Sequence, residues 1–300
     1  MSSTTAQEEN KGTGRVITRF GAELLIQCTD KTSLRCTTKR KLDNAACGDW
    51  VDWQRNQTGT ARIDKIHPRK NALTRLTYRG RANTIAANID QLIIVSSWLP
   101  EPFWDLVDRY LIAAEMLSAE AVIVINKQDL AEQYATEADW EALAEYEAIG
   151  YTVLHMNTKD NTGTEALRQH MRGKTNILLG RSGVGKSSIA NRIMPDASIL
   201  TADISDSGEG RHTTTTATLY DLGEEVYLMD SPGVRDYAPD NLDAIKLANG
   251  YREFKPFMND CHFSNCTHNH EPKCSVRSAA ESGSISSNRY QRYLDALNNL

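Results

Sequence analysis

A glycine-rich segment in the middle of the chain has the residue types of a phosphate-binding loop. Residues 180–188 read Gly-Arg-Ser-Gly-Val-Gly-Lys-Ser-Ser, after the apolar run 177–179 and before an expected helix over 186–193. Glycines let backbone N–H groups face phosphates at a helix N-terminus, and this context favours a phosphate loop over an incidental turn. Lys186 is expected to reach the β- and γ-phosphates, and the Ser187 hydroxyl to bind Mg²⁺. The expected nucleotide contacts are Gly180, Arg181, Ser182, Gly183, Val184, Gly185, Lys186, Ser187 and Ser188.

A second polar segment has the form of a guanine reader. Asn126, Lys127 and Asp129 belong to an Asn-Lys-x-Asp tetrapeptide that follows the apolar, strand-like run 121–125. The Asp129 carboxylate can accept two N–H bonds from guanine, whereas adenine offers no such donor pair. Asn126 would bond the purine or tie neighbouring loops, and the Lys127 stem would cover a face of the base. Alone, the tetrapeptide fits a solvated loop equally well; beside a phosphate loop it predicts a guanine site.

The order of these two segments is unusual. In most GTPases the phosphate loop precedes the guanine reader, whereas here it follows. The chain therefore has the motif order of a circularly permuted GTPase. A third element, residues 230–233 with the sequence Asp-Ser-Pro-Gly, follows the strand-like run 226–229. Asp230 can hold Mg²⁺ through water, and the Gly233 N–H can sense the γ-phosphate.

The catalytic group that orients water is less well defined. Many GTPases carry Gln after the glycine of this third motif, but Val234 stands here and cannot orient a water molecule. His212 in the threonine-rich loop 208–216 is the candidate substitute, with a surface histidine as the alternative. One of Thr213, Thr214 and Thr215 is expected to supply a hydroxyl to Mg²⁺. The catalytic candidates are thus His212, Lys186, Asp230 and Gly233, with slow intrinsic hydrolysis that needs a partner. Residues 156–159 form a degenerate version of the last guanine-pocket loop.

Near the C-terminus, cysteine and histidine have the spacing of a metal site. Cys261, Cys266, His268 and Cys274 lie within 14 residues and supply three thiolates and one imidazole. Such a set closes a tetrahedral structural Zn²⁺ site with no position left for water, and it favours a metal site over scattered buried cysteines. His262 and His270 are competing ligands ranked below His268. Cys28, Cys36 and Cys47 remain, and are expected to be reduced thiols.

Charge is divided unevenly along the chain. Residues 11–81 carry 16 Lys and Arg against 6 Asp and Glu, a net charge of +10, whereas residues 82–300 carry 18 against 31, a net charge of −13. A basic module of this kind suggests contact with RNA phosphates, although a solvated basic face is the alternative. Lys39, Arg40 and Lys41 are the first candidates for phosphate contact. Trp50 and Trp53 are expected to pack in a barrel core or rim rather than stack on bases.

Secondary-structure patterns divide the chain into a β part, an α/β part and a helical part. Five strand-like segments fit a small barrel of the OB or SH3-like type, followed by a polar connector over 69–84 and by alternating strands and helices that favour a mostly parallel sheet. No segment resembles a membrane span or a signal peptide, so a cytoplasmic protein is expected. The expected strands are 15–18, 22–29, 33–38, 50–55, 61–66, 92–95, 121–125, 152–154, 177–179 and 226–229; the expected helices are 104–117, 137–149, 186–193, 242–254 and 286–300.

From about residue 14 to its end the chain resembles the RsgA family, circularly permuted GTPases of small-ribosomal-subunit biogenesis. The resemblance is carried by the tetrapeptide 126–129, the phosphate loop 180–188, Gly-x-His-Thr-Thr-Thr at 210–215, Asp-Ser-Pro-Gly-Val-Arg at 230–235 and the cysteine spacing. Asn157 and Thr158 depart from the usual Ser-Ser or Ser-Ala pair.

The resemblance implies a multidomain protein: an N-terminal β-barrel (OB-fold), a central α/β P-loop GTPase domain with circular permutation and a C-terminal α-helical zinc-binding domain. We expect a disordered tail over 1–12, the RNA-binding OB-fold over 13–72, the GTPase domain over 73–236 and the zinc domain over 237–300. The resemblance also implies a late-acting assembly factor that binds the small ribosomal subunit and rRNA. We expect the protein to be a monomer, with other assembly factors as further possible partners. Its turnover of GTP to GDP and phosphate would be stimulated by the subunit and coupled to release. The alternatives are an RNA-binding, GTP-dependent scaffold and a GTPase of another ribonucleoprotein assembly.

Overall fold

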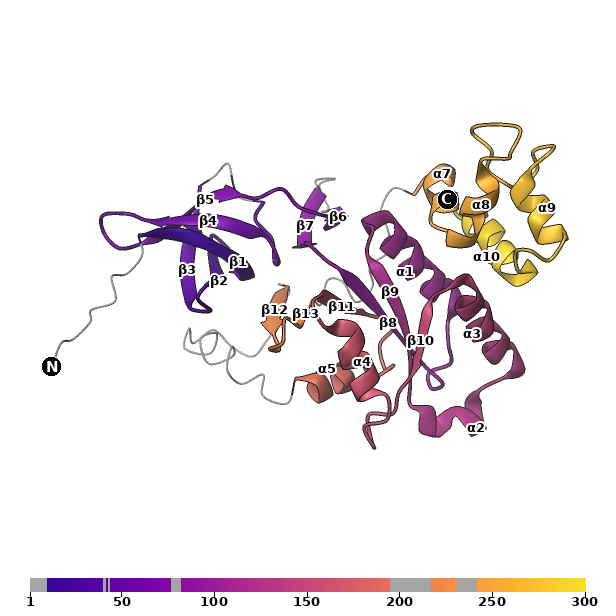
Figure 1. Cartoon of the computed structure of the whole chain (residues 1–300), viewed down its shortest axis with the longest axis horizontal. Helices are drawn as coiled ribbons and strands as arrows, with labels where there is room; N and C mark the ends of the chain where they lie inside the picture. Colours follow the sequence, from indigo (N-terminus) through magenta and orange to yellow (C-terminus); the bar gives the residue numbers. More distant parts are fainter. Residues whose placement is uncertain (1–9, 40–41, 43, 77–81, 195–216, 231–241) are drawn as a thin grey trace. The chain divides into compact units, whose positions relative to one another are not determined.

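A computed structural model describes residues 10–39, 42, 44–76, 82–194, 217–230 and 242–300 (Figure 1). These residues form two compact units, and each is described by itself. Of the described residues, the first unit contains 10–39, 42, 44–76, 82–89, 217–221 and 227–230, and the second contains 90–194, 222–226 and 242–300. Among the described residues, no helix is both long and apolar enough to cross a bilayer.

The first unit contains a closed five-stranded barrel. Its strands are β1 (Lys11–Phe20), β2 (Glu23–Cys28), β3 (Ser33–Thr38), β4 (Trp50–Arg55) and β5 (Ala61–Ile66). They close in the order β1-β2-β3-β5-β4, with β3 and β5 parallel and the other pairs antiparallel. This arrangement is the Greek-key barrel of the OB-fold and confirms that prediction. Trp53 lies in the barrel core at 6% exposure, whereas Trp50 is 42% exposed.

The segment expected to be a polar connector forms a hairpin instead. β6 (Ala72–Leu76) pairs with β7 (Ala82–Ala87), and Leu73, Ala86 and Ala87 are fully buried. The side chain of Asn71 bonds the backbone N–H and C=O of Ile89, which fixes one end of the hairpin. The connector prediction was wrong because the buried residues of these strands are one leucine and two alanines. They give too weak an alternation of apolar and polar residues to indicate strands.

Two more strands of the first unit pack beside the barrel. β12 (Thr218–Asp221) and β13 (Tyr227–Asp230) are antiparallel. The hydroxyl groups of Thr218 and Thr18 of β1 lie 3.4 Å apart. Lys31 Nζ donates to the Asp221 carboxylate at 2.7 Å, and the Arg15 guanidinium lies over the Tyr227 ring. The hairpin that ends at Asp230 is therefore attached to the barrel through both polar and cation–π contacts.

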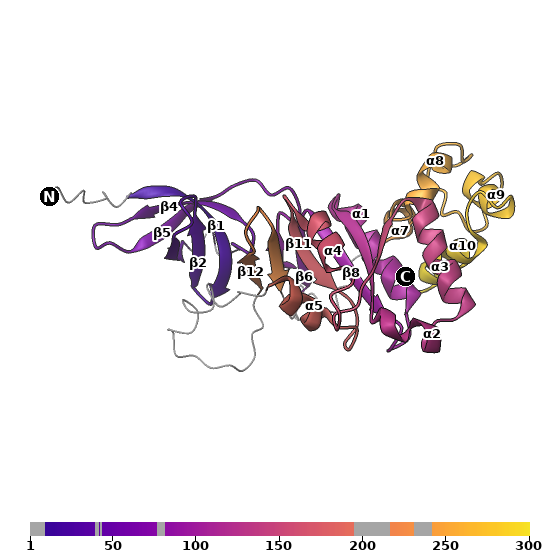
Figure 2. The same cartoon turned by 60° about the horizontal axis from the view of Figure 1, so that its bottom comes forward.

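The second unit is built on parallel strands. β8 (Gln91–Ser97), β9 (Glu120–Asn126), β10 (Thr152–His155) and β11 (Thr175–Leu179) lie in the order β10-β9-β8-β11, and each neighbouring pair is parallel (Figure 1). Figure 2 shows β8 and β11 from a second direction. α1 packs on β8 and β9, and α3 packs on β10. β8 and β9 are almost wholly buried, as expected for a parallel sheet covered by helices. The helical elements here are α1 (Trp104–Leu117), η2 (Gln128–Leu130), α2 (Ala131–Tyr134), α3 (Glu137–Ile149), α4 (Thr164–Met171) and α5 (Lys186–Ile193).

The C-terminal helices share a hydrophobic core with α1. They are α7 (Ala244–Asn249), η4 (Arg252–Phe254), α8 (Lys255–Met258), α9 (Ser275–Glu281) and α10 (Ser287–Asn298). Ile112 of α1 is buried with Leu247, Tyr251 and Phe254. The helix expected over 242–254 is divided at Gly250, where a Cβ atom would lie 2.5 Å from Ile112. Close approach to α1 thus requires glycine where the two helical pieces meet.

A buried ionic network also joins these helices to α1 and α3. Arg289 and Asp108 form an ion pair with side-chain exposures of only 1% and 4%, and Arg289 also pairs with Glu253 at 2.7 Å. Arg292 joins Asp108 and Glu145 at 2.7 and 3.1 Å. Burial alone would lower the pKa of Arg289, but the charges of Asp108 and Glu253 raise it well above its ordinary value. The guanidinium therefore stays charged and requires its carboxylate partners.

Candidate functional site

The phosphate-loop residues form a tight turn between β11 and α5. Gly180 has φ of +142°, and a Cβ atom there would lie 2.2 Å from the carbonyl oxygen of Val95. At Gly185 a Cβ atom would lie 2.2 Å from Asn126 Nδ2. Alanine fits neither position, so the close backbone approach expected of a phosphate loop is present. Lys186 Nζ lies over the loop and donates to the carbonyl oxygens of Gly180 and Arg181 at 2.5 and 2.7 Å.

The N-terminus of α5 offers a cradle for an anion. α5 starts immediately after Gly185, and no side chain caps this end. Gly183 and Gly185 have positive φ angles of 85° and 99°, and Val184 between them is buried. Successive N–H groups in such a turn, together with the helix dipole, favour a bound phosphate. Ser187 and Ser188 lie exposed in the first turn, so a hydroxyl is available where a phosphate-bound cation would need it.

The guanine-reader segment lies directly beside this loop. Asn126, fully buried at the end of β9, donates from Nδ2 to the Val184 carbonyl oxygen at 2.9 Å. Its Oδ1 atom is buried and has no hydrogen-bond partner among the described residues. Lys127 adopts the left-handed conformation and donates from Nζ to the carbonyl oxygens of Leu99 and Gly183 at 2.5 and 2.7 Å. The structure therefore brings together two motifs that lie more than 50 residues apart in the sequence.

Asp129 faces the degenerate loop 156–159. Its carboxylate pairs with Lys159 at 2.6 Å, and its side chain is 27% exposed. Asn157 stabilises the loop by accepting from the Lys159 N–H at 3.2 Å and donating to Asp160 at 2.8 Å. Hydrogen bonds from Thr162 hold the pKa of the Asp160 carboxyl below its ordinary value. Asn157 thus supports the turn of this loop through its carboxamide, which a serine could do only in part.

The structure does not place the remaining predicted nucleotide-site residues beside the phosphate loop. Asp230 is the exposed last residue of β13, in the first unit. His212, Thr213, Thr214, Thr215 and Gly233 lie outside the residues that the structure describes, as do Val234 and the cations Arg40 and Lys41. The catalytic histidine and the Mg²⁺ hydroxyl ligand therefore stay predictions.

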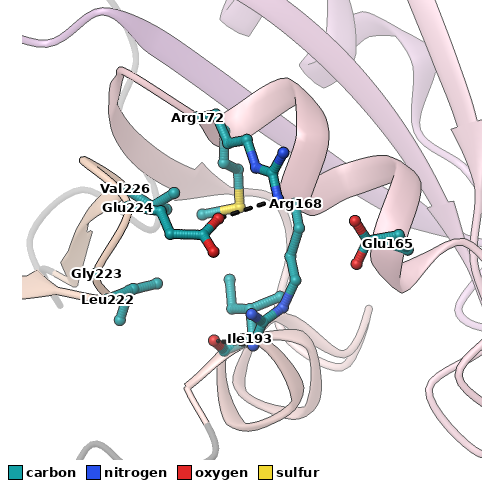
Figure 3. Close-up of a pocket in the computed structure, with 9 residues that line it drawn as sticks. Glu165, Arg168, Arg172, Ile193, Leu222, Gly223, Glu224 and Val226 are labelled. Carbon is teal, nitrogen blue, oxygen red and sulfur yellow. Dashed lines mark hydrogen bonds and ion pairs between the residues drawn. The ribbon is translucent and has the colours of Figure 1, made fainter.

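A separate cavity of about 230 Å³ is lined by residues along α4, by Ile193 at the C-terminal end of α5 and by the turn 222–226 (Figure 3). Arg168 and Arg172 of α4 line it with Ile193 and the turn 222–226. Arg168 donates to the Ile193 carbonyl oxygen at 2.8 Å, and Arg172 pairs with Glu224 at 3.0 Å. None of the predicted nucleotide contacts lines this cavity. Its arginines stabilise the end of α5 and the turn.

Four C-terminal side chains converge as a metal-ligand set. The ligand atoms of Cys261, Cys266, His268 and Cys274 all lie within 4.8 Å of one another. His268 Nδ1 lies 3.5 Å from the sulfur atoms of both Cys261 and Cys274, and its Nε2 is buried without a partner among the described residues. Three thiols and one imidazole fit a closed tetrahedral Zn²⁺ site. His262 is not a member of this group and packs against Phe263 instead.

Burial sets the protonation of these ligands. Burial raises the pKa of the Cys266 thiol to about 12 and also raises that of Cys274, whereas it lowers the pKa of His268. The imidazole is therefore neutral near pH 7, and its nitrogen lone pair is available to a metal. The buried thiols stay protonated until a cation displaces their protons. Burial favours a higher pKa for nearby Glu271, but hydrogen bonds from Thr267 and Asn269 lower it to about 2.

Fold and site together define a class of protein. The phosphate-loop and guanine-reader segments meet at one edge of a parallel sheet, in reversed chain order. In the sequence they follow an OB-type barrel and precede a helical Cys₃His region, which is the order of parts in a circularly permuted P-loop GTPase. The RsgA GTPase family model matches residues 66–239. The chain belongs to this family and is a GTP hydrolase.

Individual relatives agree with this assignment. Small ribosomal subunit biogenesis GTPase RsgA 1 of Vibrio vulnificus is 40% identical over 288 residues, which cover 93% of this chain and 81% of the relative. The crystal structure of YjeQ from Thermotoga maritima superposes with a TM-score of 0.78 at 30% identity, over 97% of this chain and 98% of the other. The fold is also that of YloQ, a circularly permuted GTPase, with a TM-score of 0.74 at 24% identity over 98% and 97% of the two chains.

Proposed function

We propose that this GTPase acts in late assembly of the small ribosomal subunit, binding the subunit and its rRNA. Hydrolysis of GTP to GDP and phosphate is stimulated by the subunit and coupled to release. The observation that carries the proposal is a relative named for small-subunit biogenesis that is 40% identical over 93% of this chain. The predicted separation of a basic β part from an acidic remainder supports it, because phosphate contacts dominate affinity for RNA.

The barrel is the proposed RNA-binding part. Its cations include Lys39 and Arg62, whose side chains are 47% and 49% exposed and lie 2.8 and 3.3 Å from Asp64. Surface pairs of this kind contribute only about 0–1 kcal/mol, so an RNA phosphate can replace the carboxylate at little cost. Lys39 thus keeps its proposed role in phosphate contact. Trp50, exposed beside Arg15 at 5.7 Å, offers an additional aromatic face.

Different residues of the chain have different proposed roles in binding and hydrolysing GTP. Asp129 and Asn126 hold guanine, and the 180–188 backbone with Lys186 holds the β- and γ-phosphates. When bound, Mg²⁺ neutralises charge that develops on the phosphates, and Ser187, Asp230 and one threonine of 213–215 are its proposed ligands. His212 orients the attacking water. Zn²⁺ held by Cys261, Cys266, His268 and Cys274 stabilises the C-terminal helices and takes no part in the reaction.

The proposed division of the chain is the one expected from sequence: a tail over 1–12, an RNA-binding barrel over 13–72, a GTPase domain over 73–236 and a zinc domain over 237–300. The proposed active form is a monomer in the cytoplasm, where its ribosomal substrate is assembled.

Hydrolysis of GTP and of ATP, measured with and without purified small ribosomal subunits, tests the proposal. We expect slow turnover of GTP that rises at least about tenfold with subunits, and no turnover of ATP. Lys186→Ala should abolish the stimulated rate, which excludes a contaminating hydrolase. GTP turnover that subunits leave unchanged would contradict the ribosomal role while leaving the GTPase assignment intact.

A further inference from the structure

Gln128, the variable residue of the Asn-Lys-x-Asp segment, joins three parts of the second unit. Its backbone N–H donates to the carbonyl oxygen of Met156 at 3.0 Å. Its side-chain Oε1 lies 3.2 Å from Trp98 Nε1 and 3.1 Å from His155 Nδ1. Trp98 follows β8, and His155 ends β10, so one side chain connects the ends of two strands to the guanine-reader turn.

The donors fix the orientation of this side chain. An indole N–H can only donate, so the Gln128 atom that faces Trp98 must be the carboxamide oxygen. The same oxygen can only accept, and His155 must therefore carry its proton on Nδ1. Trp98 is 1% exposed. Removal of the acceptor would leave its buried N–H without a partner, which proteins avoid.

Aromatic packing holds both donors in place. The rings of Trp98 and Trp140 have centroids 4.8 Å apart, and those of Trp140 and His155 are 5.9 Å apart. Trp140 lies in the first turn of α3, where Thr136 and Asp139 form a reciprocal capping box. Trp98 and His155, the donors to Gln128, therefore pack against the first turn of α3, which the capping box stabilises.

The turn that Gln128 anchors is a strained one. Lys127 immediately before it has φ of +58°, a left-handed conformation that a lysine adopts only when its surroundings impose it. Asp129 immediately after it carries the carboxylate that would accept guanine N–H groups. Recognition by two hydrogen bonds needs this carboxylate placed to within about 0.5 Å.

We infer that Gln128 is a specificity-determining positioning residue, which fixes the Asp129 carboxylate for guanine through its bonds to Trp98 and His155. The inference rests on the proposed role of Asp129 in reading guanine. It predicts that loss of the acceptor weakens base recognition and leaves phosphate binding unchanged, because the side chain of Gln128 contacts Trp98 and His155 and not Lys186 or the loop 180–188.

Binding of GDP, ADP and inorganic pyrophosphate by the full-length protein, measured by calorimetry, tests the inference. Gln128→Met keeps the side-chain length but removes the acceptor; we expect the Kd for GDP to rise about tenfold and those for ADP and pyrophosphate to change less than twofold. Gln133→Met, at an exposed position of α2 five residues away, is the matched control and should change none of them.

Changes at the donor His155 give a second, independent readout. His155→Asn places an amide N–H near the position of Nδ1 and should keep the affinity for GDP, whereas His155→Leu should reproduce the loss. The double variant Gln128→Met/His155→Leu should lose no more than either single variant, since both remove one shared contact.

Three results would overturn these assignments. An unchanged ratio of GDP to ADP affinity in Gln128→Met, or an equal loss of pyrophosphate affinity, would mean that Gln128 has no base-specific role. Wild-type protein that does not prefer GDP to ADP would instead contradict the assignment of Asp129, on which the inference depends.

Discussion

At the scale of single residues, Asp129 is the group on which we propose that nucleotide specificity depends. Its carboxylate is partly exposed, pairs with Lys159 and follows the strained turn at Lys127. A carboxylate accepts two N–H bonds and donates none, which matches guanine. An asparagine in its place has one donor and one acceptor, which matches the C2 carbonyl and N–H of xanthine.

Asp129→Asn should therefore exchange guanine for xanthine specificity. We expect kcat/KM for GTP to fall at least about 100-fold, because a site built for a donor pair rejects a base that does not match it. Turnover of XTP should rise correspondingly, as measured by phosphate release. Glu132→Gln, an exposed carboxylate of the following helix, is the control and should leave both rates unchanged. Equal loss of GTP and XTP turnover would mean that Asp129 supports the fold instead.

Asp108 is the residue whose loss should cost the most stability. It is 3% exposed and is the shared partner of Arg289, Arg292 and the Tyr146 hydroxyl. Asp108→Asn removes the carboxylate that Arg289 and Arg292 share and leaves each buried guanidinium with one remaining carboxylate partner, Glu253 or Glu145. We expect the free energy of unfolding to fall by about 3–5 kcal/mol in urea titrations. Glu281→Gln removes one partner of an exposed pair with Arg277, 3.6 Å long, and should cost at most about 1 kcal/mol. If both variants lost a similar free energy of unfolding, burial of the ion pair would not be the reason for the larger loss expected at Asp108.

At the scale of elements, the Cys₃His segment before α9 is a structure that a metal should complete. Tyr290 and Tyr293 of α10 donate to the carbonyl oxygens of His268 and Thr267, so the ligand loop is bonded to the last helix. Loss of the metal should therefore loosen α10 as well as the loop.

Cys261→Ser, or treatment with a strong chelator, should remove one equivalent of zinc measured by elemental analysis and lower the thermal midpoint of the C-terminal helices. Because burial raises the pKa of Cys266 to about 12 and also that of Cys274, zinc must displace at least two protons. Apparent zinc affinity should then fall by at least about two orders of magnitude per unit decrease in pH near neutrality. Cys47→Ser, outside the ligand set, is the control for zinc content, and an affinity independent of pH would contradict thiolate ligation.

The contact of α1 with η4 and α8 should depend on pH. Burial alone would raise the pKa of Glu115, but hydrogen bonds from Lys255 and Arg252 outweigh it and lower the pKa below the ordinary 4.5. A carboxyl with a lowered folded-state pKa stabilises the fold above its unfolded-state pKa and loses this contribution as pH falls. Glu115→Gln should cost about 1–2 kcal/mol at pH 7 and progressively less below pH 4.5, as measured by denaturant unfolding. A difference that stays constant with pH would exclude the ionised pair as its cause.

At the scale of the whole molecule, the permutation places the 230–233 motif at the end of the GTPase segment, immediately before the C-terminal helices. The strand that ends at Asp230 also belongs to a hairpin attached to the barrel through Lys31 and Asp221. We predict that loss of the γ-phosphate acts on the C-terminal part of the chain through the covalent connection at this motif. The core that α1 shares with α7 and α10 limits any such movement of the C-terminal helices relative to α1.

We predict that the nucleotide controls affinity for the small subunit. GTP would hold the barrel and the zinc region in an arrangement that binds rRNA, and hydrolysis would release it. Co-sedimentation with purified subunits should show at least about tenfold tighter binding with a non-hydrolysable GTP analogue than with GDP. Lys186→Ala should remove this difference in affinity, because the variant lacks the side chain that is proposed to bind the β- and γ-phosphates. Equal affinities in the wild-type protein would exclude coupling of hydrolysis to release.

Sequence patterns predicted the elements whose signal is local. α1, α3 and α5 have the bounds expected from apolar periodicity and flanking residues, and the five barrel strands lie where alternation and turn residues indicated. The hairpin β6–β7 was missed because its apolar content is low, and α4 and α9 were not anticipated. These short elements are stabilised mainly by neighbours that are distant in sequence.

For this protein, the sequence by itself determined the motif order, the glycines at the close backbone approaches, the proposed acceptor for guanine and the Cys₃His spacing. These depend on residue type and short spacing, which a sequence displays directly. Only the tertiary structure decided which side chains support them. Trp98, Gln128 and His155 come from separate strand ends, and Asp108 and Arg289 lie 181 residues apart. Such contacts arise from sheet order and helix packing, so no local pattern encodes them.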